Sequence, residues 1–253
     1  LLLDRLREAL TDLNPDLPSY AIDEAVQKLH RVEHPDLLSN NRAFQSYVRG
    51  GVPVTVKAEH GDRTLLARLF DRTHIKRNDW LVVNQFTVIE HRNTRRLDLV
   101  LFVNGIPVVA FELKNAADPS ATIEKAYKQF QTYQAELPTF LQYNGFLVIS
   151  DGWNARAGTL TADEERFMQW RTIDGDDLAP AAIPQLEVLI RGMCEPARLL
   201  DILHSFLLFQ DDGASLTKIL AGYHQAHAVN KAVEHTLKAI SGDRRIGVVW
   251  HTQ

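Results

Sequence analysis

Asp98, Glu112 and Lys114 stand at the ends of two apolar segments and have the residue types and spacing of a hydrolytic site. The pair Asn104-Gly105 between the segments favours a tight β-hairpin, because the turns of such hairpins need two residues that tolerate positive φ. This hairpin would bring Asp98 back beside Glu112 and Lys114. Side chains two residues apart in a strand share a face of the sheet, so Glu112 and Lys114 would project together.

Two carboxylates beside a lysine suit the magnesium-dependent hydrolysis of a phosphodiester. Mg²⁺ prefers oxygen ligands and is usually held by one or two carboxylates with water and substrate phosphate. Asp98 and Glu112 are the predicted ligands, and the backbone carbonyl of Leu113 is a further candidate. Lys114 would orient the attacking water or stabilise charge on the phosphate. The alternative is that Asp98 only caps a strand and that Glu112 and Lys114 form a surface ion pair, because such spacings also arise by chance.

The apolar segments predict the fold class. Residues 99–103 and 106–111 are apolar on both faces, which is typical of central strands covered by helices on both sides. Ionisable groups at the ends of such strands are costly to bury, so they are candidates for function. We therefore predict an α/β fold with a mixed central sheet flanked by helices.

Other elements follow from periodicity and from capping residues. The predicted helices span 1–12, 20–31 (with Ser19 as the cap), 118–136 (with Asp118 or Ser120 as the cap), 197–209 and about 216–239. The predicted strands span 52–58, 64–70, 80–90 and 145–152, and the first three are expected to continue one sheet into the hairpin. A polar stretch over 173–189 suggests a domain boundary.

Gln129 and Tyr133 are four residues apart on the predicted helix 118–136 and so share one helix face. That helix follows the Lys114 strand and would pack back over the same end of the sheet. Beside the acidic pair, we expect Gln129 and Tyr133 to contact DNA phosphate or to orient the site. An amphipathic surface pair without a role is the alternative.

Composition and charge limit the possible function classes. The chain has 253 residues with a net charge of −4, which argues against a generally basic nucleic-acid surface, so DNA contacts would be local. The local candidates are Arg92, Arg95 and Arg96, just before Asp98. A second basic cluster consists of Arg72, His74, Lys76 and Arg77, for which solvated loop charges are the alternative. A single cysteine fits a reducing cytoplasm. No segment approaches the ~20 apolar residues of a membrane span, so no membrane association is expected.

The motifs together resemble the PD-(D/E)xK nucleases of the RecB-like group, which carry a QxxxY motif on the helix after the lysine strand. More closely, the chain resembles the N-terminal part of the restriction subunit of type I restriction–modification enzymes. Leu97 stands where a proline often precedes the aspartate of that family, a position that affects strand entry rather than chemistry. The segments that carry the resemblance are NDWLVVNQFTVIE (78–90), RRLDLVLFVNGIPVVAFELKN (95–115), GFLVISDG (145–152), KILAGYHQAHAVNKAVE (218–234) and RRIGVVWHTQ (244–253).

The resemblance implies a restriction-endonuclease-like nuclease domain over 1–185. Over 186–253 it implies a helical linker and the start of a RecA-like motor domain, cut before its P-loop, with 246–250 as the strand that feeds that loop. The implied function is Mg²⁺-dependent endonucleolytic cleavage of double-stranded DNA in a complex with methylation (M) and specificity (S) subunits. ATP would serve only the full-length protein.

The resemblance also suggests further site residues and leaves alternatives open. Glu24 on an early helix is a candidate additional metal ligand, with Glu33 and His34 as rivals, and Gln225 is a candidate adenine contact. One alternative is a non-catalytic DNA-binding or assembly module. Another is a stand-alone repair or resolvase-type nuclease, against which the C-terminal resemblance argues.

Overall fold

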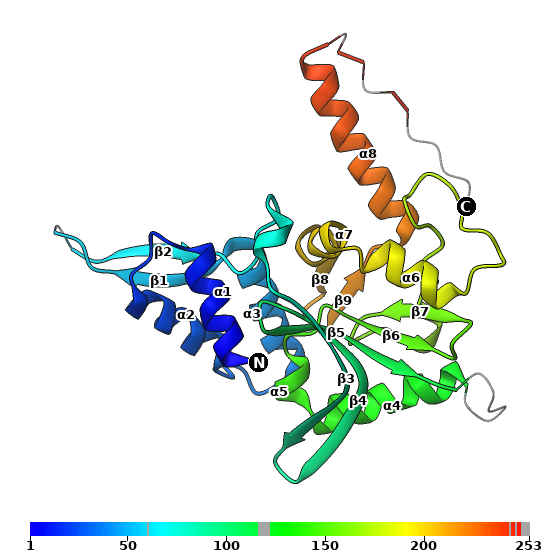
Figure 1. Cartoon of the computed structure of the whole chain (residues 1–253), viewed down its shortest axis with the longest axis horizontal. Coiled ribbons are helices and arrows are strands. Elements are labelled where there is room, and N and C mark those ends of the chain that lie inside the picture. Colours follow the sequence, from blue (N-terminus) through cyan, green and yellow to red (C-terminus); the bar gives the residue numbers. More distant parts are fainter. Residues whose placement is uncertain (60, 116–121, 243, 246, 249–253) are drawn as a thin grey trace.

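The structure is a computed structural model that describes residues 1–59, 61–115, 122–242, 244–245 and 247–248. A five-stranded sheet of order β3-β4-β5-β6-β7 lies at its centre, with helices on both sides (Figure 1). β5 and β6 run parallel and the other neighbours antiparallel, so the sheet is mixed, as predicted. The strands are β3 (Trp80–Glu90), β4 (Asn93–Val103), β5 (Ile106–Leu113), β6 (Phe146–Ser150) and β7 (Ala155–Gly158).

The predicted hairpin between β4 and β5 is confirmed. Asn104 has a φ of 53° and Gly105 a φ of 74°, which are the left-handed conformations that a tight primed turn requires. The ladder then pairs Val103 with Ile106 at the turn end. Gly105 also lies against the N-terminus of α1 (Leu3–Leu13), where it accepts a hydrogen bond from the backbone of Leu2 at 2.8 Å.

Two hydrophobic layers cover the two faces of the sheet. α4 (Ile123–Glu136) and α5 (Pro138–Leu141) pack on one face, where Phe130 and Tyr133 are fully buried. On the other face, helices from both ends of the chain pack in a single hydrophobic cluster with β5 and β6. These helices are α1, α2 (Ser19–His30), α3 (Leu37–Gly50), α6 (Gln185–Met193) and α7 (Pro196–Asp201).

The prediction that one sheet contains all the N-terminal strands was wrong. β1 (Val52–Val56) and β2 (Arg63–Ala67) form a separate two-stranded sheet beside α2. The buried residues Val52, Val54 and Ala67 give this ribbon one apolar face, and the hydrophobic cluster that includes α2 covers it. Alternation in the sequence identifies a strand but does not say which neighbour the strand pairs with.

The C-terminal helices were also predicted incorrectly. α7 continues as a π-helical turn over Ile202–Phe206, and then two short strands, β8 (Leu207–Asp211) and β9 (Leu216–Leu220), pair as a hairpin. α8 therefore begins only at Tyr223 and runs to Ile240, extending away from the body of the protein (Figure 1). Short apolar runs of this kind fit helix and strand equally well by periodicity, and tertiary pairing decides between them.

Helix starts differ from the predicted caps. Thr122 caps α4 by accepting a hydrogen bond from the backbone N–H of Lys125, whereas Asp118 and Ser120 lie outside the described residues. Ser19 is the first residue of α2 and not its cap, since the capping position is occupied by Pro18. A strand over 246–250 cannot be compared, because residues 246, 249 and 250 lie outside the described residues.

The segment after residue 185 packs into the same core as the central sheet. Leu189 of α6 and Leu199 of α7 are completely buried within the cluster that includes β5 and β6. Among the helices of the described residues, none combines the length and the apolar character that crossing a membrane requires.

Candidate active site

The structure brings the three predicted catalytic residues together where β4 and β5 run side by side. Asp98 lies on β4, Glu112 is near the end of β5, and Lys114 follows that strand. The Lys114 ammonium donates a hydrogen bond to Glu112 Oε1 at 2.6 Å. Asp98 Oδ2 accepts a hydrogen bond from the backbone N–H of Leu113 at 2.8 Å, so the hairpin itself fixes this carboxylate beside Glu112.

Glu112 is buried, with 4% of its surface exposed. Burial raises the pKa of Glu112, and the charge of the nearby Asp98 adds to this rise. The hydrogen bond and charge of Lys114 oppose the rise but do not cancel it. The site therefore places a carboxylate where its charge is unfavourable without a nearby cation.

α4 contacts this site through the two residues predicted to share its face. Gln129 Nε2 donates a hydrogen bond to the Tyr133 hydroxyl at 3.0 Å, and that hydroxyl lies 3.2 Å from Glu112 Oε2. The same hydroxyl is 3.3 Å from the carbonyl oxygen of Arg96. Burial and the charge of Glu112 raise the pKa of Tyr133 to about 12, so this hydroxyl stays protonated at neutral pH and acts as a donor.

Arg95 and Arg96 have different surroundings. The Arg95 guanidinium forms a bidentate ion pair with Glu136 at the end of α4, with one of the two contacts at 2.7 Å. Arg96 is exposed, and no ion pair of its side chain is found within the described part of the chain. Arg96 is therefore the freer of the two cations near Asp98.

The predicted extra metal ligand Glu24 and the predicted adenine contact Gln225 both have contacts elsewhere. Glu24 accepts a hydrogen bond from the backbone of Thr55 at 2.8 Å and pairs with Lys28, and these contacts lower the pKa of Glu24. Gln225 Oε1 accepts a hydrogen bond from the backbone N–H of Gly222 at 2.9 Å, which caps the start of α8. These contacts tie Glu24 to β1 and Gln225 to the start of its own helix.

The rival ligands to Glu24 lie in the loop before α3. The carboxylate of Glu33 is 3.4 Å from the hydroxyl of Tyr47. The backbone of His34 donates a hydrogen bond to the side chain of Asn40 at 2.9 Å. Both residues thus take part in contacts with α3.

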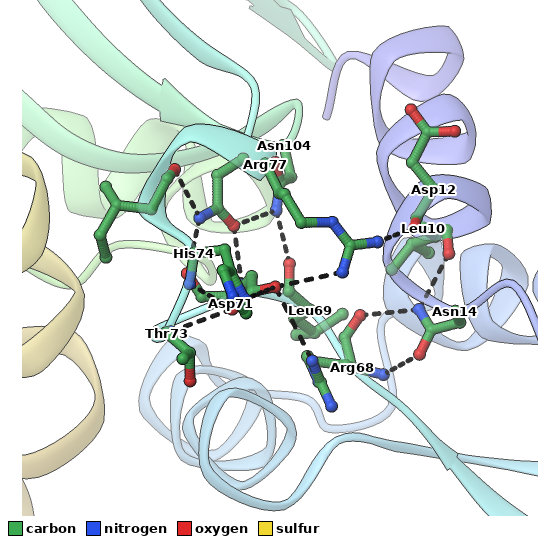
Figure 2. Close-up of polar contacts among 12 residues, drawn as sticks. Leu10, Asp12, Asn14, Arg68, Leu69, Asp71, Thr73, His74, Arg77 and Asn104 are labelled. Carbon is green, nitrogen blue, oxygen red and sulfur yellow. Dashed lines mark hydrogen bonds and ion pairs between the residues drawn. The ribbon is translucent and has the colours of Figure 1, made fainter.

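The second basic cluster lies at the opposite end of β5 from Glu112. Its members His74 and Arg77 lie beside Asp71, whereas Arg72 pairs with Asp201. Asp71 is 1% exposed and accepts hydrogen bonds from the backbone N–H groups of Thr73 and His74 (Figure 2). Burial raises the pKa of Asp71, but these hydrogen bonds and the charges of His74 and Arg68 outweigh burial and lower it. His74 and Arg77 therefore balance a buried carboxylate at the turn end of the hairpin and not the candidate site.

The contact between Gln85 and Asp98 was not anticipated from the sequence. Gln85 on the edge strand β3 donates a hydrogen bond from Nε2 to Asp98 Oδ1 at 3.1 Å. In the sequence, Gln85 is a polar residue in an apolar strand, two positions before the polar Thr87. This pattern is equally typical of a side chain that faces solvent.

The donor set at the site fits a hard divalent cation such as Mg²⁺. Asp98 and Glu112 supply carboxylate oxygens, and Leu113, whose carbonyl is a further candidate, follows Glu112 in the chain and hydrogen-bonds Asp98 through its backbone N–H. In the part of the chain that is described, no group of three or more His, Cys, Asp or Glu side chains is arranged to hold a metal. A two-carboxylate site leaves the remaining positions to water and substrate phosphate, which is usual for Mg²⁺.

Comparison with known proteins identifies relatives along the whole chain. Residues 1–166 match the family described as the type I restriction enzyme R protein N terminus. The type I restriction enzyme HindI endonuclease subunit of Haemophilus influenzae is 39% identical over 99% of this chain and 24% of the relative. A provisionally named type I restriction enzyme MjaIXP endonuclease subunit of Methanocaldococcus jannaschii is 30% identical over 100% of this chain and 26% of the relative. The chain thus spans about a quarter of the length of these curated relatives.

Proposed function

The chain belongs to the family of type I restriction enzyme R protein N termini, and from this membership we propose that it is the nuclease part of a restriction subunit. The proposed reaction is Mg²⁺-dependent endonucleolytic hydrolysis of double-stranded DNA. The observation that supports it is the convergence of Asp98, Glu112 and Lys114 at one end of β5.

Asp98 and Glu112 are the proposed ligands of the Mg²⁺ ion, together with the carbonyl of Leu113. When bound, the ion would supply Lewis-acid polarisation of the phosphoryl oxygen and a lowered pKa for its water. The protein holds both carboxylates before any ion arrives, because the backbone N–H of Leu113 fixes Asp98 and the Lys114 ammonium fixes Glu112. This preorganisation reduces the cost of assembling the site.

Lys114 has two roles in this proposal. In the free protein it forms an ion pair with the buried Glu112 carboxylate, and with 21% of its side chain exposed it still reaches solvent. During hydrolysis its ammonium would orient the attacking water or stabilise the negative charge on the phosphate.

Gln129 and Tyr133 act in this proposal as orienting residues. Gln129 donates to the Tyr133 hydroxyl, and that hydroxyl in turn reaches Glu112 Oε2. The chain of contacts holds the second carboxylate oxygen of Glu112, while Lys114 holds the first. Arg96 is the proposed contact for the DNA backbone, since Arg95 is engaged by Glu136.

The whole protein is proposed to work in a complex. Methylation and specificity subunits would supply DNA modification and sequence recognition, and ATP would act at a motor region outside this chain. Family membership supports this part of the proposal, and the coverage of about a quarter of the relatives' length is consistent with a motor region elsewhere in the whole protein.

The test is DNA cleavage by the full-length protein assembled with its methylation and specificity subunits. Asp98→Asn and Lys114→Ala should each abolish plasmid cleavage, because the first removes a ligand charge and the second a cation at the reacting phosphate. Lys128→Ala is the matched control, because Lys128 lies on the exposed side of α4 and, among the described residues, its ion pair is with Glu124 of the same helix.

DNA-stimulated ATP hydrolysis serves as the readout of correct folding and assembly. The proposal requires cleavage to be lost while ATP hydrolysis is retained in both site variants. Wild-type cleavage by Asp98→Asn and Lys114→Ala would instead favour a non-catalytic DNA-binding or assembly module.

A further inference from the structure

Gln85 has a left-handed backbone conformation although it lies inside a β-strand and not in a turn. Its φ is 51°, in the left-handed region that residues other than glycine adopt uncommonly. His91 and Asn104 also have positive φ, but both lie in hairpin turns, where the turn geometry demands it. Gln85 lies inside the 11-residue strand β3, and strain of this kind gathers at functional sites.

The side-chain alternation of β3 changes at Gln85. Leu81 and Val83 before it, and Phe86 and Val88 after it, all pack against the hydrophobic layer under α4. An uninterrupted strand would place Val83 and Phe86 on opposite faces. The left-handed conformation of Gln85 therefore shifts the alternation, so that side chains at odd positions before it and at even positions after it face α4.

β4 shows the same change at the same point. Leu97 and Val100 both belong to the layer under α4, although regular alternation would put them on opposite faces. The ladder pairs Phe86 with Leu97, so Gln85 lies opposite Asp98, where both strands are irregular. Irregularities of this kind occur beside active sites, where they redirect a side chain.

The two strands on either side of β4 thus each supply one hydrogen-bond donor to Asp98. Gln85 Nε2 donates to Oδ1 at 3.1 Å from β3, and the Leu113 backbone donates to Oδ2 at 2.8 Å from β5. With both oxygens held, the carboxylate is fixed in one orientation. Each oxygen keeps a further lone pair for a metal ion.

We propose that Gln85 is a positioning residue that holds the Asp98 carboxylate in the orientation of a preformed metal site. This inference rests on the proposed function, because it needs Asp98 to be a metal ligand. Groups that hydrogen-bond to a metal ligand orient it, and their removal typically weakens metal binding about 10- to 100-fold.

Gln85→Gly separates the amide from the backbone conformation. Glycine adopts positive φ readily, so the variant keeps the irregularity in β3 and loses only the hydrogen bond to Asp98. His91→Gly is the matched control: His91 has a φ of 54°, lies at the tip of the same hairpin, and is not one of the predicted site residues. Thermal unfolding of both variants should stay close to that of the wild type.

The measurement is calorimetric titration of Mn²⁺ into the 253-residue chain. The Kd of Gln85→Gly should rise about 10- to 100-fold, while His91→Gly should match the wild type and Asp98→Asn should not bind. A residue with only a structural role would instead lower the unfolding temperature without this selective loss of affinity.

The other outcomes separate this inference from the proposed function. A wild-type Kd for Gln85→Gly, with binding lost in Asp98→Asn, overturns the positioning role and leaves the metal site intact. Equal binding by Asp98→Asn and the wild type overturns both. Absence of binding by the wild-type chain overturns the preformed site, and the cleavage experiment then decides on the proposed function independently.

Discussion

At the scale of a single residue, Glu112 is a site residue whose buried charge lowers the stability of the folded chain. Its carboxylate is buried beside Asp98, and Lys114 offsets only part of the unfavourable environment. Because the pKa of Glu112 is higher in the folded than in the unfolded chain, its stabilising contribution is present at acidic pH. That contribution is lost as the pH rises through the folded pKa.

Glu112→Gln should therefore stabilise the metal-free chain at pH 7 by about 1 kcal/mol, since glutamine keeps the acceptor for Lys114 without a buried charge. Near pH 4 the gain should disappear, because Glu112 is then largely protonated in the wild type. Urea unfolding at both pH values measures the difference, and Glu124→Gln, an exposed surface change, should leave the free energy of unfolding nearly unchanged. A loss of stability at pH 7 would contradict this account.

At the scale of elements, the hairpin of β4 and β5 is held at one end by a turn that has no room for a side chain at Gly105. A Cβ on Gly105 would lie 2.5 Å from the carbonyl oxygen of Leu2 and 2.8 Å from the backbone nitrogen of Leu6. Both contacts are with backbone at the start of α1, which cannot rotate away as a flexible side chain could. The turn thus fixes α1 against the hairpin whose other end carries the site.

Gly105→Ala is expected to destabilise the chain more than a positive φ alone explains. Gly213→Ala is the matched comparison, because Gly213 has a φ of 81° and no atom within 4 Å of an added Cβ. The conformational cost should be roughly 1–2 kcal/mol for both, and the steric conflict at Gly105 should add about 1–3 kcal/mol. Equal losses in chemical denaturation would show that α1 moves aside without cost.

At the scale of the whole molecule, Lys218 joins the C-terminal hairpin to the core. Its side chain belongs to β9, is 2% exposed, and donates hydrogen bonds to Asn41 Oδ1 of α3 and to the carbonyl of Asn144 at 2.8 and 2.6 Å. Burial lowers the pKa of Lys218 to about 7. A residue late in the chain thus connects α3 with the loop that precedes β6.

This placement predicts a pH dependence of stability. Between pH 7 and about 10.4, Lys218 is mostly neutral in the folded chain but protonated in the unfolded chain, so its contribution to the free energy of unfolding rises with pH. The free energy of unfolding of the wild type minus that of Lys218→Met should therefore increase with pH, by at most ~1.4 kcal/mol per pH unit. The free energies of unfolding of both proteins are measured by chemical denaturation from pH 6 to 10. A constant difference between the two proteins over this range would contradict the prediction.

Local sequence was sufficient for the centre of the fold and for the placement of Asp98, Glu112 and Lys114 side by side. The hairpin around Asn104 and Gly105 was predictable because its turn chemistry and its apolar strands agree, and this agreement places Asp98 beside Glu112. Gln129 and Tyr133 were predictable as a pair because helical spacing sets their common face. Their reach to Glu112 needed the packing of α4 on the sheet.

What only the tertiary structure decided depends on contacts between distant segments. β8 and β9 are strands because they pair with each other, and β1 and β2 leave the main sheet because their apolar face is covered by the cluster around α2. Gln85 reaches Asp98 because two strands become irregular at the same point, which no local pattern records. By itself, the sequence determined which residues have the chemistry of the site, because residue type and short-range spacing are local. The tertiary structure decided which side chains hold them in place, because packing is not local.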